Sequence, residues 1–479
     1  MYPEMYPSGW DSYSCFLGFV AVSVSVAFLL LLKGKDGANK KGKLPPGGTG
    51  WPIIGETITF YRDYNSPQPR RFSDDHERRY GPIFRCNLFG NAQTVLSIDP
   101  EFNKYVLQNE GRLFKSRYPY STRNLIGKYG LLEVHGELQR KLHGMAANLM
   151  KYDTLTTDFQ DDIEHVFLTG MKKWESQRDI PLQPSCHQVV LNLMGRKLLS
   201  LPPAEEMQEI YEAFNIYVKA ILCLPLNIPG TAYAKGVKAR KTIIKKVHQS
   251  IEERRQHPEV VYNDLLAKLL REGTYSEEII ADMILFLLFA GYETSSTIMS
   301  FAVKYITHNP RALEELRAEH DALLKAKGNE KLTMDDFKSM KFTHCVIKET
   351  LRLTNVASIT FRETKQDIKV KDFVIPKGWT VVILLSGTHL DERHYPEPLK
   401  FDPWRWENEG YDLSKDSSFM PFGKGARLCP GYHLARFEIA LFLHSFLTKF
   451  RWEPLEVGPD ILFPLPHMAK GFPIRLSPR

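Results

Sequence analysis

The strongest hydrophobic signal lies near the start of the chain, where residues 15–32 form a run without a charged side chain. A run of about 18 apolar residues can cross a bilayer as a helix. Acidic residues precede this run, and lysines follow it directly: Lys33, Lys35, Lys40, Lys41 and Lys43. The positive-inside rule then predicts a lumenal segment at 1–14, a transmembrane signal anchor at 15–32, and a cytosolic remainder. A cleaved signal peptide would need basic residues before the run and a small-residue cleavage site after it, and both are missing.

Residues 33–50 are predicted to link this anchor to the rest of the chain. They join the lysines to Pro45-Pro46-Gly47-Gly48, which is typical of a stiff spacer that ends in a bend. The sequence contains no second linker of this kind. Residues 51–479 are therefore predicted to form one large domain with a substantial core.

Within this domain, helical periodicity dominates from about residue 136 to residue 354. The segments Ile83–Leu88 and Thr94–Ile98 flank Gly90-Asn91, which predicts a hairpin. A second sheet region is predicted at 367–371 and 374–385, with a turn at 376–378. The fold class is thus mainly α with a small β-rich lobe.

The longest predicted helix begins near Thr274 and ends at Asn309-Pro310. Thr274 and Glu277 form a capping-box pattern at its start. The middle of the helix, residues 283–290, is apolar on all sides but far too short to cross a bilayer. This pattern predicts a helix that runs through the protein core. A further helix is predicted over His433–Leu447.

The most informative stretch for function is the run from Phe422 to Gly431. Cys429 lies in a glycine-rich bend with Gly425, where backbone N–H groups can point at its sulfur. Arg427 is placed to bind a haem propionate, and Phe422 can pack on the cysteine side of the porphyrin. Gly431 begins a helix whose N-terminus favours a thiolate. The alternative is a buried cysteine in a glycine-rich loop, but so many fitting residues in register favour a thiolate ligand for haem iron.

A second candidate site lies in the long helix. Ala290 and Thr294 share a face, and the small residues at 290 and 291 leave room beside the backbone. We expect the Thr294 hydroxyl to bond the carbonyl of residue 290 and to loosen the helix locally. With the carboxylate of Glu293, it would form a short proton relay for the cleavage of dioxygen. Taken alone, this pattern would more often be a packing notch.

Composition and charge exclude several other classes of protein. The chain has 479 residues, 43% hydrophobic and 25% charged, which is ordinary for a globular protein. Its net charge of +7 is spread along the chain, so no nucleic-acid partner is expected. The six cysteines lack paired spacing, which favours a reducing compartment over a disulfide framework.

The Cys429 and Thr294 motifs together resemble those of the cytochrome P-450 superfamily. The resemblance implies a P-450 fold, haem b held by the Cys429 thiolate, and a monooxygenase reaction with dioxygen. Glu349 and Arg352 resemble the family's Glu-x-x-Arg element, and Arg405 its Pro-x-Arg element. By this resemblance the three form a buried charge network behind the haem loop, although an i,i+3 pair is normally a surface salt bridge.

The sequence departs from the family pattern in the helix that grips a propionate. Many members carry Trp-x-x-x-Arg there, whereas this chain has Gln139 and His143. Arg140, His143 and Arg362 are therefore candidates for holding the propionates, besides Arg427. His143 could equally be an ordinary surface histidine.

The substrate pocket is expected to be apolar, because the segments predicted above the haem carry no charge. These are Phe286, Phe289, Ala290, Thr294 and residues 356–359, of which Phe286 is equally well placed as a core residue. Several stretches, among them residues 102–112 and 338–343, resemble the conifer diterpene resin-acid oxidases of the abietadienol/abietadienal oxidase group. This resemblance implies that a tricyclic diterpene olefin, alcohol or aldehyde is oxidised stepwise towards a resin acid. The alternatives are a sterol or brassinosteroid side-chain hydroxylase of the same clan, and a non-catalytic haem-binding membrane protein.

The sequence contains no visible flavin or nicotinamide motif, so the electrons must come from outside. The resemblance implies a separate NADPH–cytochrome P-450 reductase on the same membrane, that of the endoplasmic reticulum. Lys424, Arg427 and Arg436 surround Cys429 and predict a basic docking face for this partner. Ordinary solvated charges would explain Lys424 and Arg436 equally well.

Overall fold

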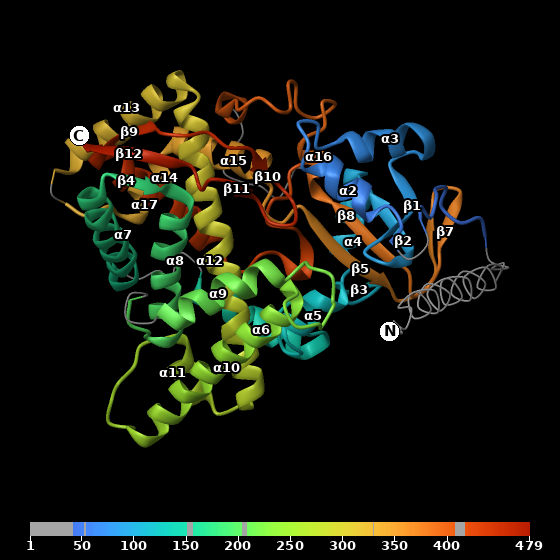
Figure 1. Ribbon diagram of the computed structural model, residues 1–479, viewed down its shortest axis with the longest axis horizontal. Coiled ribbons are helices and arrows are strands. Elements are labelled where there is room, and N and C mark those ends of the chain that lie inside the picture. Colours follow the sequence, from blue (N-terminus) through green and yellow to red (C-terminus); the bar gives the residue numbers. More distant parts are fainter. Residues whose placement is uncertain (1–41, 52–53, 151–156, 204–207, 329, 408–416) are drawn as a thin grey trace, which may run out of the picture.

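The computed structural model describes residues 42–51, 54–150, 157–203, 208–328, 330–407 and 417–479. The predicted anchor at 15–32 lies outside the described residues. Figure 1 shows most helices gathered on one side of the molecule and a β-rich lobe on the other. This arrangement confirms the predicted fold class of a mainly helical domain with a small β-rich lobe.

Sixteen α-helices and two short 3-10 helices are described in these ranges. They are α2 (Thr57–Tyr64), α3 (Arg71–Tyr80), α4 (Pro100–Gln108), α5 (Tyr120–Ile126), α6 (Gly136–Leu149), α7 (Thr157–Gln177), α8 (Leu182–Leu199), α9 (Gln208–Ala220), α10 (Ala232–Gln256), α11 (Leu265–Glu272), α12 (Glu277–Thr307), α13 (Pro310–Lys327), α14 (Met334–Ser339), α15 (Lys341–Thr354), α16 (Leu385–His389), η3 (Pro403–Trp406), η4 (Gly425–Arg427) and α17 (Tyr432–Lys449).

The described strands form four small sheets. The strands are β1 (Ile83–Leu88), β2 (Asn91–Ser97), β3 (Phe114–Ser116), β4 (Asp179–Pro181), β5 (Ile359–Thr364), β6 (Ile368–Val370), β7 (Phe373–Ile375), β8 (Thr380–Leu384), β9 (Phe450–Pro454), β10 (Asp460–Ile461), β11 (His467–Met468) and β12 (Pro473–Pro478). The largest sheet has the order β1-β2-β8-β5-β3, and another has the order β4-β12-β9.

The hairpin predicted around Gly90 is confirmed as the antiparallel pair β1 and β2. The second predicted sheet region divides differently from the expectation. β6 pairs with β7 in a sheet of their own, whereas β8 joins the main sheet, parallel to β2 and antiparallel to β5. Residues 376–378 therefore separate two sheets. All five residues of β8 are buried, so this strand needs neighbours on both sides, whereas β7 is partly exposed.

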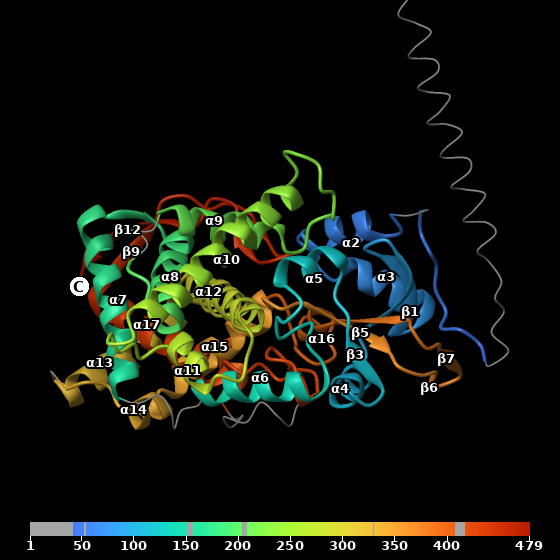
Figure 2. The same cartoon turned by 90° about the horizontal axis from the view of Figure 1, so that it is seen from below.

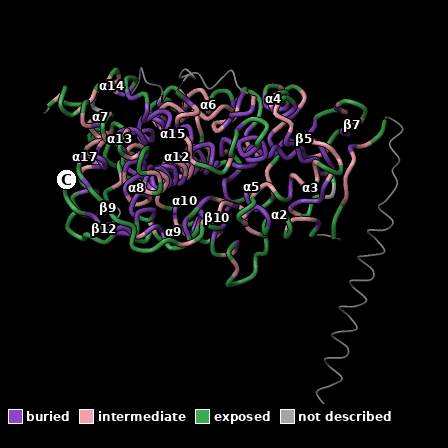
Figure 3. The backbone as a smooth tube through the Cα atoms, turned by 90° about the horizontal axis from the view of Figure 1, so that it is seen from above, coloured by how far each residue is buried: buried purple, intermediate pink, exposed green. Residues whose placement is uncertain are grey.

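Helix α12 forms the axis of the helical side, as Figures 1 and 2 show. It begins at Ser276, whose side chain accepts a hydrogen bond from the Ile279 N–H. The predicted helix is thus confirmed, but its N-cap is Ser276 and not Thr274. Among the described helices, α12 alone is long and apolar enough to span a membrane, and 72% of its apolar window is buried inside the protein. Figure 3 shows this buried centre, which α12 shares with α15.

Candidate functional site

The loop that carries Cys429 lies between η3 and α17 and depends on two glycines. Gly423 and Gly425 have φ angles of +71° and +73°, which side chains rarely adopt. A Cβ at Gly425 would lie only 2.3 Å from the carbonyl oxygen of Leu107, at the end of α4. The loop therefore approaches α4 as closely as it does only because residue 425 has no side chain.

Two opposing effects act on the sulfur of Cys429. The Gly431 N–H bonds the sulfur, which lowers its pKa, but burial has the larger effect and raises the pKa of Cys429 to about 11. The protein alone thus favours the thiol, and a bound metal cation would be needed to keep a thiolate here. α17 begins at Tyr432, directly after Gly431, as the sequence predicted within one residue. This donor set fits haem iron, with Cys429 as the residue that would hold it.

The middle of α12 supplies the second part of the site. The side chains at 283–288 are buried, whereas Phe289, Ala290 and Thr294 are partly exposed. The Thr294 Oγ1 donates a hydrogen bond of 2.7 Å to the carbonyl oxygen of Ala290, which confirms the expected back-bond. Because the hydroxyl has one hydrogen, it does not donate to Glu293 in this arrangement. While its hydrogen is donated to Ala290, the Thr294 hydroxyl can only accept a hydrogen bond. The proton relay predicted from the sequence therefore needs this back-bond to open before Thr294 can pass a proton on.

Glu293, the residue before Thr294, is buried. Burial raises the pKa of Glu293 to about 7, and the nearby ammonium of Lys219 on α9 offsets only part of this rise. A carboxyl group with a pKa near neutrality can both take up and release a proton under working conditions. Its position next to Thr294 and its pKa both suit a general acid.

Sequence analysis missed a second buried carboxyl group, Glu438 on α17. It bonds Ser295 of α12, the residue after Thr294, and burial raises its pKa to about 8. α12 and α17 pack against each other, so this bond ties the two helices of the site together. The available signal was one carboxylate within the otherwise apolar stretch of α17.

The predicted charge network around Glu349 is confirmed. The carboxylate of Glu349 and the guanidinium of Arg352 have no exposed area, and their Oε1 and Nη2 atoms are 2.8 Å apart. Arg405 contributes a third charge, with Nε 3.1 Å from Oε1 of Glu349. Trp406 also donates to this carboxylate, at 2.9 Å.

Two of the predicted propionate ligands share an anion that sequence analysis missed. The Nε atoms of Arg362 and Arg427 lie 2.6 Å and 2.8 Å from the carboxylate of Glu110, and all three side chains are buried. Arg427 also donates to the carbonyl oxygens of Leu131 and Val134. The two arginines are therefore held in place side by side, where they could bind a carboxylate of the cofactor. Sequence spacing gave no sign of Glu110, because it lies more than 250 residues from both arginines.

Replacing Glu110 by alanine is expected to destabilise this corner of the site. Two buried guanidinium groups would lose the carboxylate that neutralises them, which costs about 3–5 kcal/mol for a buried pair. Denaturant unfolding of the haem-loaded protein measures the loss, and Glu137→Ala, which removes an exposed carboxylate from α6, is the matched control. Equal stability of the Glu110 and Glu137 variants would contradict this assignment.

The other two candidates for holding the propionates, Arg140 and His143, lie on α6. Arg140 is exposed on α6. His143 is directed at the Cys429 loop, where its Nε2 lies 2.7 Å from the carbonyl oxygen of Leu428. Gln139 donates to the carbonyl oxygen of Ala426 at 3.0 Å. Both residues that depart from the family pattern thus contact the backbone of the thiolate loop.

The predicted basic docking face needs correction. The side chains of Lys424 and Arg436 are buried, with 8% and 2% of their surface exposed. Arg427 is committed to Glu110 and the carbonyl groups described above. Because Lys424 and Arg436 are buried and Arg427 is bonded inside the protein, these three cations do not form a basic surface for a protein partner. The spacing of these residues in the sequence could not show which of their side chains would be buried and which would be exposed.

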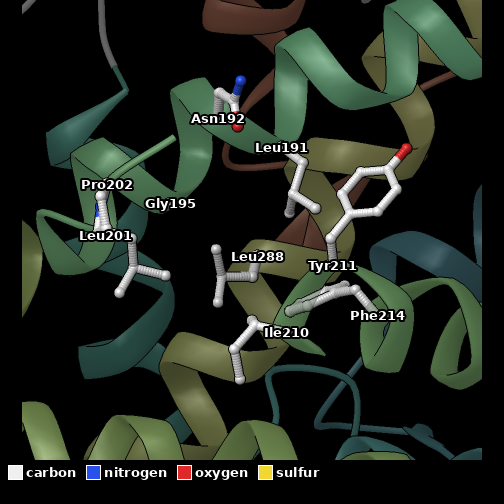
Figure 4. Close-up of a pocket in the computed structure, with 9 residues that line it drawn as sticks. All are labelled: Leu191, Asn192, Gly195, Leu201, Pro202, Ile210, Tyr211, Phe214 and Leu288. Carbon is white, nitrogen blue, oxygen red and sulfur yellow. The ribbon is translucent and has the colours of Figure 1, made fainter. Parts of the chain in front are cut away.

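The apolar residues predicted above the haem divide into two groups. Phe289, Ala290 and Ala357 expose part of their surface, whereas Phe286 and Val356 belong to the buried core. The cavity in Figure 4 is a separate feature of about 30 Å³ between α8, α9 and α12. It has room for little more than a water molecule, so it is too small for a polycyclic substrate. The residues that line it are Leu191, Asn192, Gly195, Leu201, Pro202, Ile210, Tyr211, Phe214 and Leu288.

Comparison with known proteins agrees with this geometry. The family model for cytochrome P450 matches residues 45–471. Cytochrome P450 720B2 from Pinus taeda is 58% identical over 474 residues, which cover 97% of each chain. Abietadienol/abietadienal oxidase from Pinus taeda is 56% identical over 443 residues, which cover 92% of each chain. Among solved structures, cyanobacterial CYP120A1 with bound retinoic acid has a TM-score of 0.81 at 26% identity, and the match covers 92% of this chain and all of that one.

The two parts of the site and the match over nearly the whole chain lead to one assignment. The structure combines a cysteine in a glycine-rich loop, a buried charge network of the family's pattern, and an acid–threonine pair in the core helix. Haem b with a cysteine thiolate is the cofactor of this family, and its members take their electrons from a redox partner. The chain belongs to the cytochrome P450 family and is a haem-thiolate monooxygenase.

Proposed function

We propose that this monooxygenase oxidises a hydrophobic tricyclic diterpene stepwise towards a resin acid. The observation that carries the proposal is the 56% identity, over 92% of both chains, with an abietadienol/abietadienal oxidase. The partly exposed Phe289, Ala290 and Ala357 agree with it, because they offer an apolar surface to a substrate with few polar groups.

The roles of the site residues belong to the same proposal. Cys429 would ligate the haem iron, with Phe422, Gly425 and Gly431 shaping its loop. Arg362 and Arg427 would bind the propionates: they are buried, fixed and positively charged. The thiolate-ligated haem supplies the activation of dioxygen and the oxidation of the substrate carbon.

Thr294 and Glu293 would deliver the protons. The hydroxyl of Thr294 donates to the carbonyl oxygen of Ala290, and a back-bond of this kind slightly destabilises a helix. Glu293, the preceding residue, is buried, and burial raises its pKa to about 7. Once the bond to Ala290 opens, the Thr294 hydroxyl would donate its proton, and Glu293 would replace each proton that is used.

The test is turnover in microsomes that contain the enzyme and an NADPH–cytochrome P450 reductase. Abietane-type olefins, alcohols and aldehydes are offered beside sterols, and products are identified by mass. Diterpene acids are expected, and Cys429→Ser is the control without the thiolate. Hydroxysterols alone would favour the sterol hydroxylase alternative. Haem binding without turnover of any substrate would favour a non-catalytic haem protein.

The membrane arrangement is a further part of the proposal. We infer that residues 15–32 anchor the protein in the endoplasmic reticulum membrane, that 33–50 form the linker, and that 51–479 face the cytosol, where the reductase also lies. Leu224, Leu226 and Ile228, in the loop before α10, expose more than half of their surface. Figure 2 shows this loop on the same side as α2, where Ile58 is also exposed. An apolar surface of this kind suits contact with a lipid bilayer.

A glycosylation acceptor added before residue 15 should become glycosylated in microsomes if the predicted topology holds.

The raised pKa of Glu293 predicts a pH dependence of coupling, the product formed per NADPH consumed. Between about pH 6 and pH 8 the buried carboxyl group loses its proton, so coupling should fall as pH rises. Glu293→Gln is expected to lower coupling throughout and to remove this dependence. Glu438→Gln, at the other buried carboxyl group, should keep it.

The same shift predicts the sign of a stability effect. Above its ordinary pKa of 4.5, the unfolded chain releases the Glu293 proton while the folded protein still holds it. The free energy of unfolding should therefore fall as pH rises from 4.5 towards 7, and Glu293→Gln should reduce that fall. Denaturant unfolding at several pH values measures it, and an unchanged slope in Glu293→Gln would contradict the assignment.

A further inference from the structure

Helix α6 presents two hydrogen-bond donors to the loop that carries Cys429. Gln139 and His143 are one turn apart, so their side chains share a face of the helix. Nε2 of Gln139 donates to the carbonyl oxygen of Ala426 at 3.0 Å, and Nε2 of His143 lies 2.7 Å from the carbonyl oxygen of Leu428. Because a carbonyl oxygen only accepts, Nε2 of His143 carries the hydrogen. Both bonds reach the loop within three residues of Cys429.

The bond from His143 acts on the peptide group that joins Leu428 to Cys429. The carbonyl side of this group accepts from His143, and its N–H, on the Cys429 side, donates to the carbonyl oxygen of Phe422 at 2.9 Å. A peptide group is planar, so one bond at each end fixes the orientation of the whole plane. That plane sets the direction from which the Cys429 side chain leaves the backbone.

Gln139 holds the preceding part of the same loop. Its side chain is buried, with 6% of its surface exposed, and its bond to Ala426 anchors η4 against α6. Arg140, its neighbour in sequence, points to solvent. The face of α6 that meets the loop therefore carries two neutral or weakly basic donors, Gln139 and His143. The positive charge of Arg140 lies on the exposed face of the helix.

We propose that Gln139 and His143 are positioning residues that clamp the thiolate loop through its backbone. This role rests on the assignment of Cys429 as the haem ligand. The two α6 side chains at the family's propionate-binding positions then donate to carbonyl oxygens of the loop instead. Arg362 and Arg427, which Glu110 holds together, would bind the propionates. The clamp fixes the direction in which the Cys429 side chain points, and it does not bind the carboxylates of the cofactor.

The experiment uses the purified full-length enzyme and needs no substrate. His143→Leu and Gln139→Leu each remove one donor at similar volume, and His143→Gln keeps an N–H donor. Glu137→Ala, on the exposed face of the same helix, is the matched control. Two quantities are measured: the fraction of the ferrous carbonyl complex with a thiolate-type Soret band, and the rate at which haem passes to excess apomyoglobin.

Loss of a group that orients a metal ligand typically weakens metal binding about 10-fold or more. His143→Leu is therefore expected to speed haem transfer about 10-fold and to lower the thiolate-type fraction. Gln139→Leu should act in the same direction, and His143→Gln should restore most of both quantities. Glu137→Ala should match the unchanged enzyme.

Several outcomes would overturn the clamp. Leucine variants with unchanged haem transfer and an unchanged thiolate-type band would show that the two bonds position nothing. Failure of His143→Gln to restore what His143→Leu loses would assign the effect to the shape of imidazole and not to its donor. If His143→Leu does not fold, Gln139→Leu decides between these outcomes. Absence of a thiolate-type band in the unchanged enzyme would instead reject Cys429 as the ligand.

Discussion

Replacing Glu349 by alanine is expected to abolish haem incorporation. The carboxylate accepts bonds from Arg352 through both of its oxygens, at 2.8 Å and 2.9 Å, and from Arg405 at 3.1 Å. The Trp406 ring and the Asp402 N–H also donate to it. Without it, the fully buried guanidinium group of Arg352 would remain in the interior uncompensated. Removal of one partner from a buried ion pair costs about 3–5 kcal/mol, a large share of the stability of a typical protein.

The effect should reach the thiolate loop through named contacts. Arg352 also donates to the carbonyl oxygen of His389, at 2.8 Å, and the ring of His389 accepts from the Met420 N–H, at 3.0 Å. Burial and the nearby Arg352 lower the pKa of His389 to about 3, so its ring stays neutral and able to accept. Trp406 packs on Phe419 with ring centroids 4.6 Å apart. Both routes end within three residues of Phe422, where the loop begins.

Haem content per protein and the ferrous carbonyl spectrum measure the outcome for Glu349→Ala. Asp335→Ala is the matched control, because Asp335 and Lys338 form an ion pair of the same i,i+3 spacing on the surface of α14. This control should retain its haem, since exposed pairs contribute little to stability. A normal haem spectrum in Glu349→Ala would reject the structural role.

Replacing Thr294 by alanine is expected to lower product formation about 100-fold while NADPH consumption continues. The hydroxyl would be lost from the partly exposed turn at Ala290, and with it the group that we propose passes a proton to dioxygen. Reduced oxygen would then leave as hydrogen peroxide. Product, NADPH and peroxide are measured in the same reaction. The loss should lie in the ratio of product to NADPH and not in haem content.

Ser296→Ala is the matched control for Thr294. The Ser296 hydroxyl makes the same kind of back-bond, to the carbonyl oxygen of Tyr292 at 2.6 Å, but it is fully buried in the packed side of α12. Thr294→Ser keeps the hydroxyl and should keep most of the coupling. Equal uncoupling in Thr294→Ala and Ser296→Ala would show that the effect comes from helix distortion and not from proton delivery.

Elements and chemistry that depend on neighbouring residues could be predicted from the amino-acid order. The limits of α12 and α17, the back-bond of Thr294 and the glycine-rich bend at Cys429 follow from residues a few positions apart. Capping, helical spacing and the freedom of glycine act over that range. The charge network of Glu349 and Arg352 was also predicted, because a resemblance to a known family supplied the long-range contact.

Tertiary structure alone decided which side chains meet across the chain. Glu110 joins Arg362 and Arg427, Glu438 bonds Ser295, and β8 enters the main sheet instead of a hairpin with β7. It also buried Lys424 and Arg436, against the prediction of a docking face. Burial and long-range pairing decide these cases, because the charge of a residue does not reveal which face of a loop will be covered. Only the packing of α6 against the Cys429 loop showed that Gln139 and His143 bind its backbone.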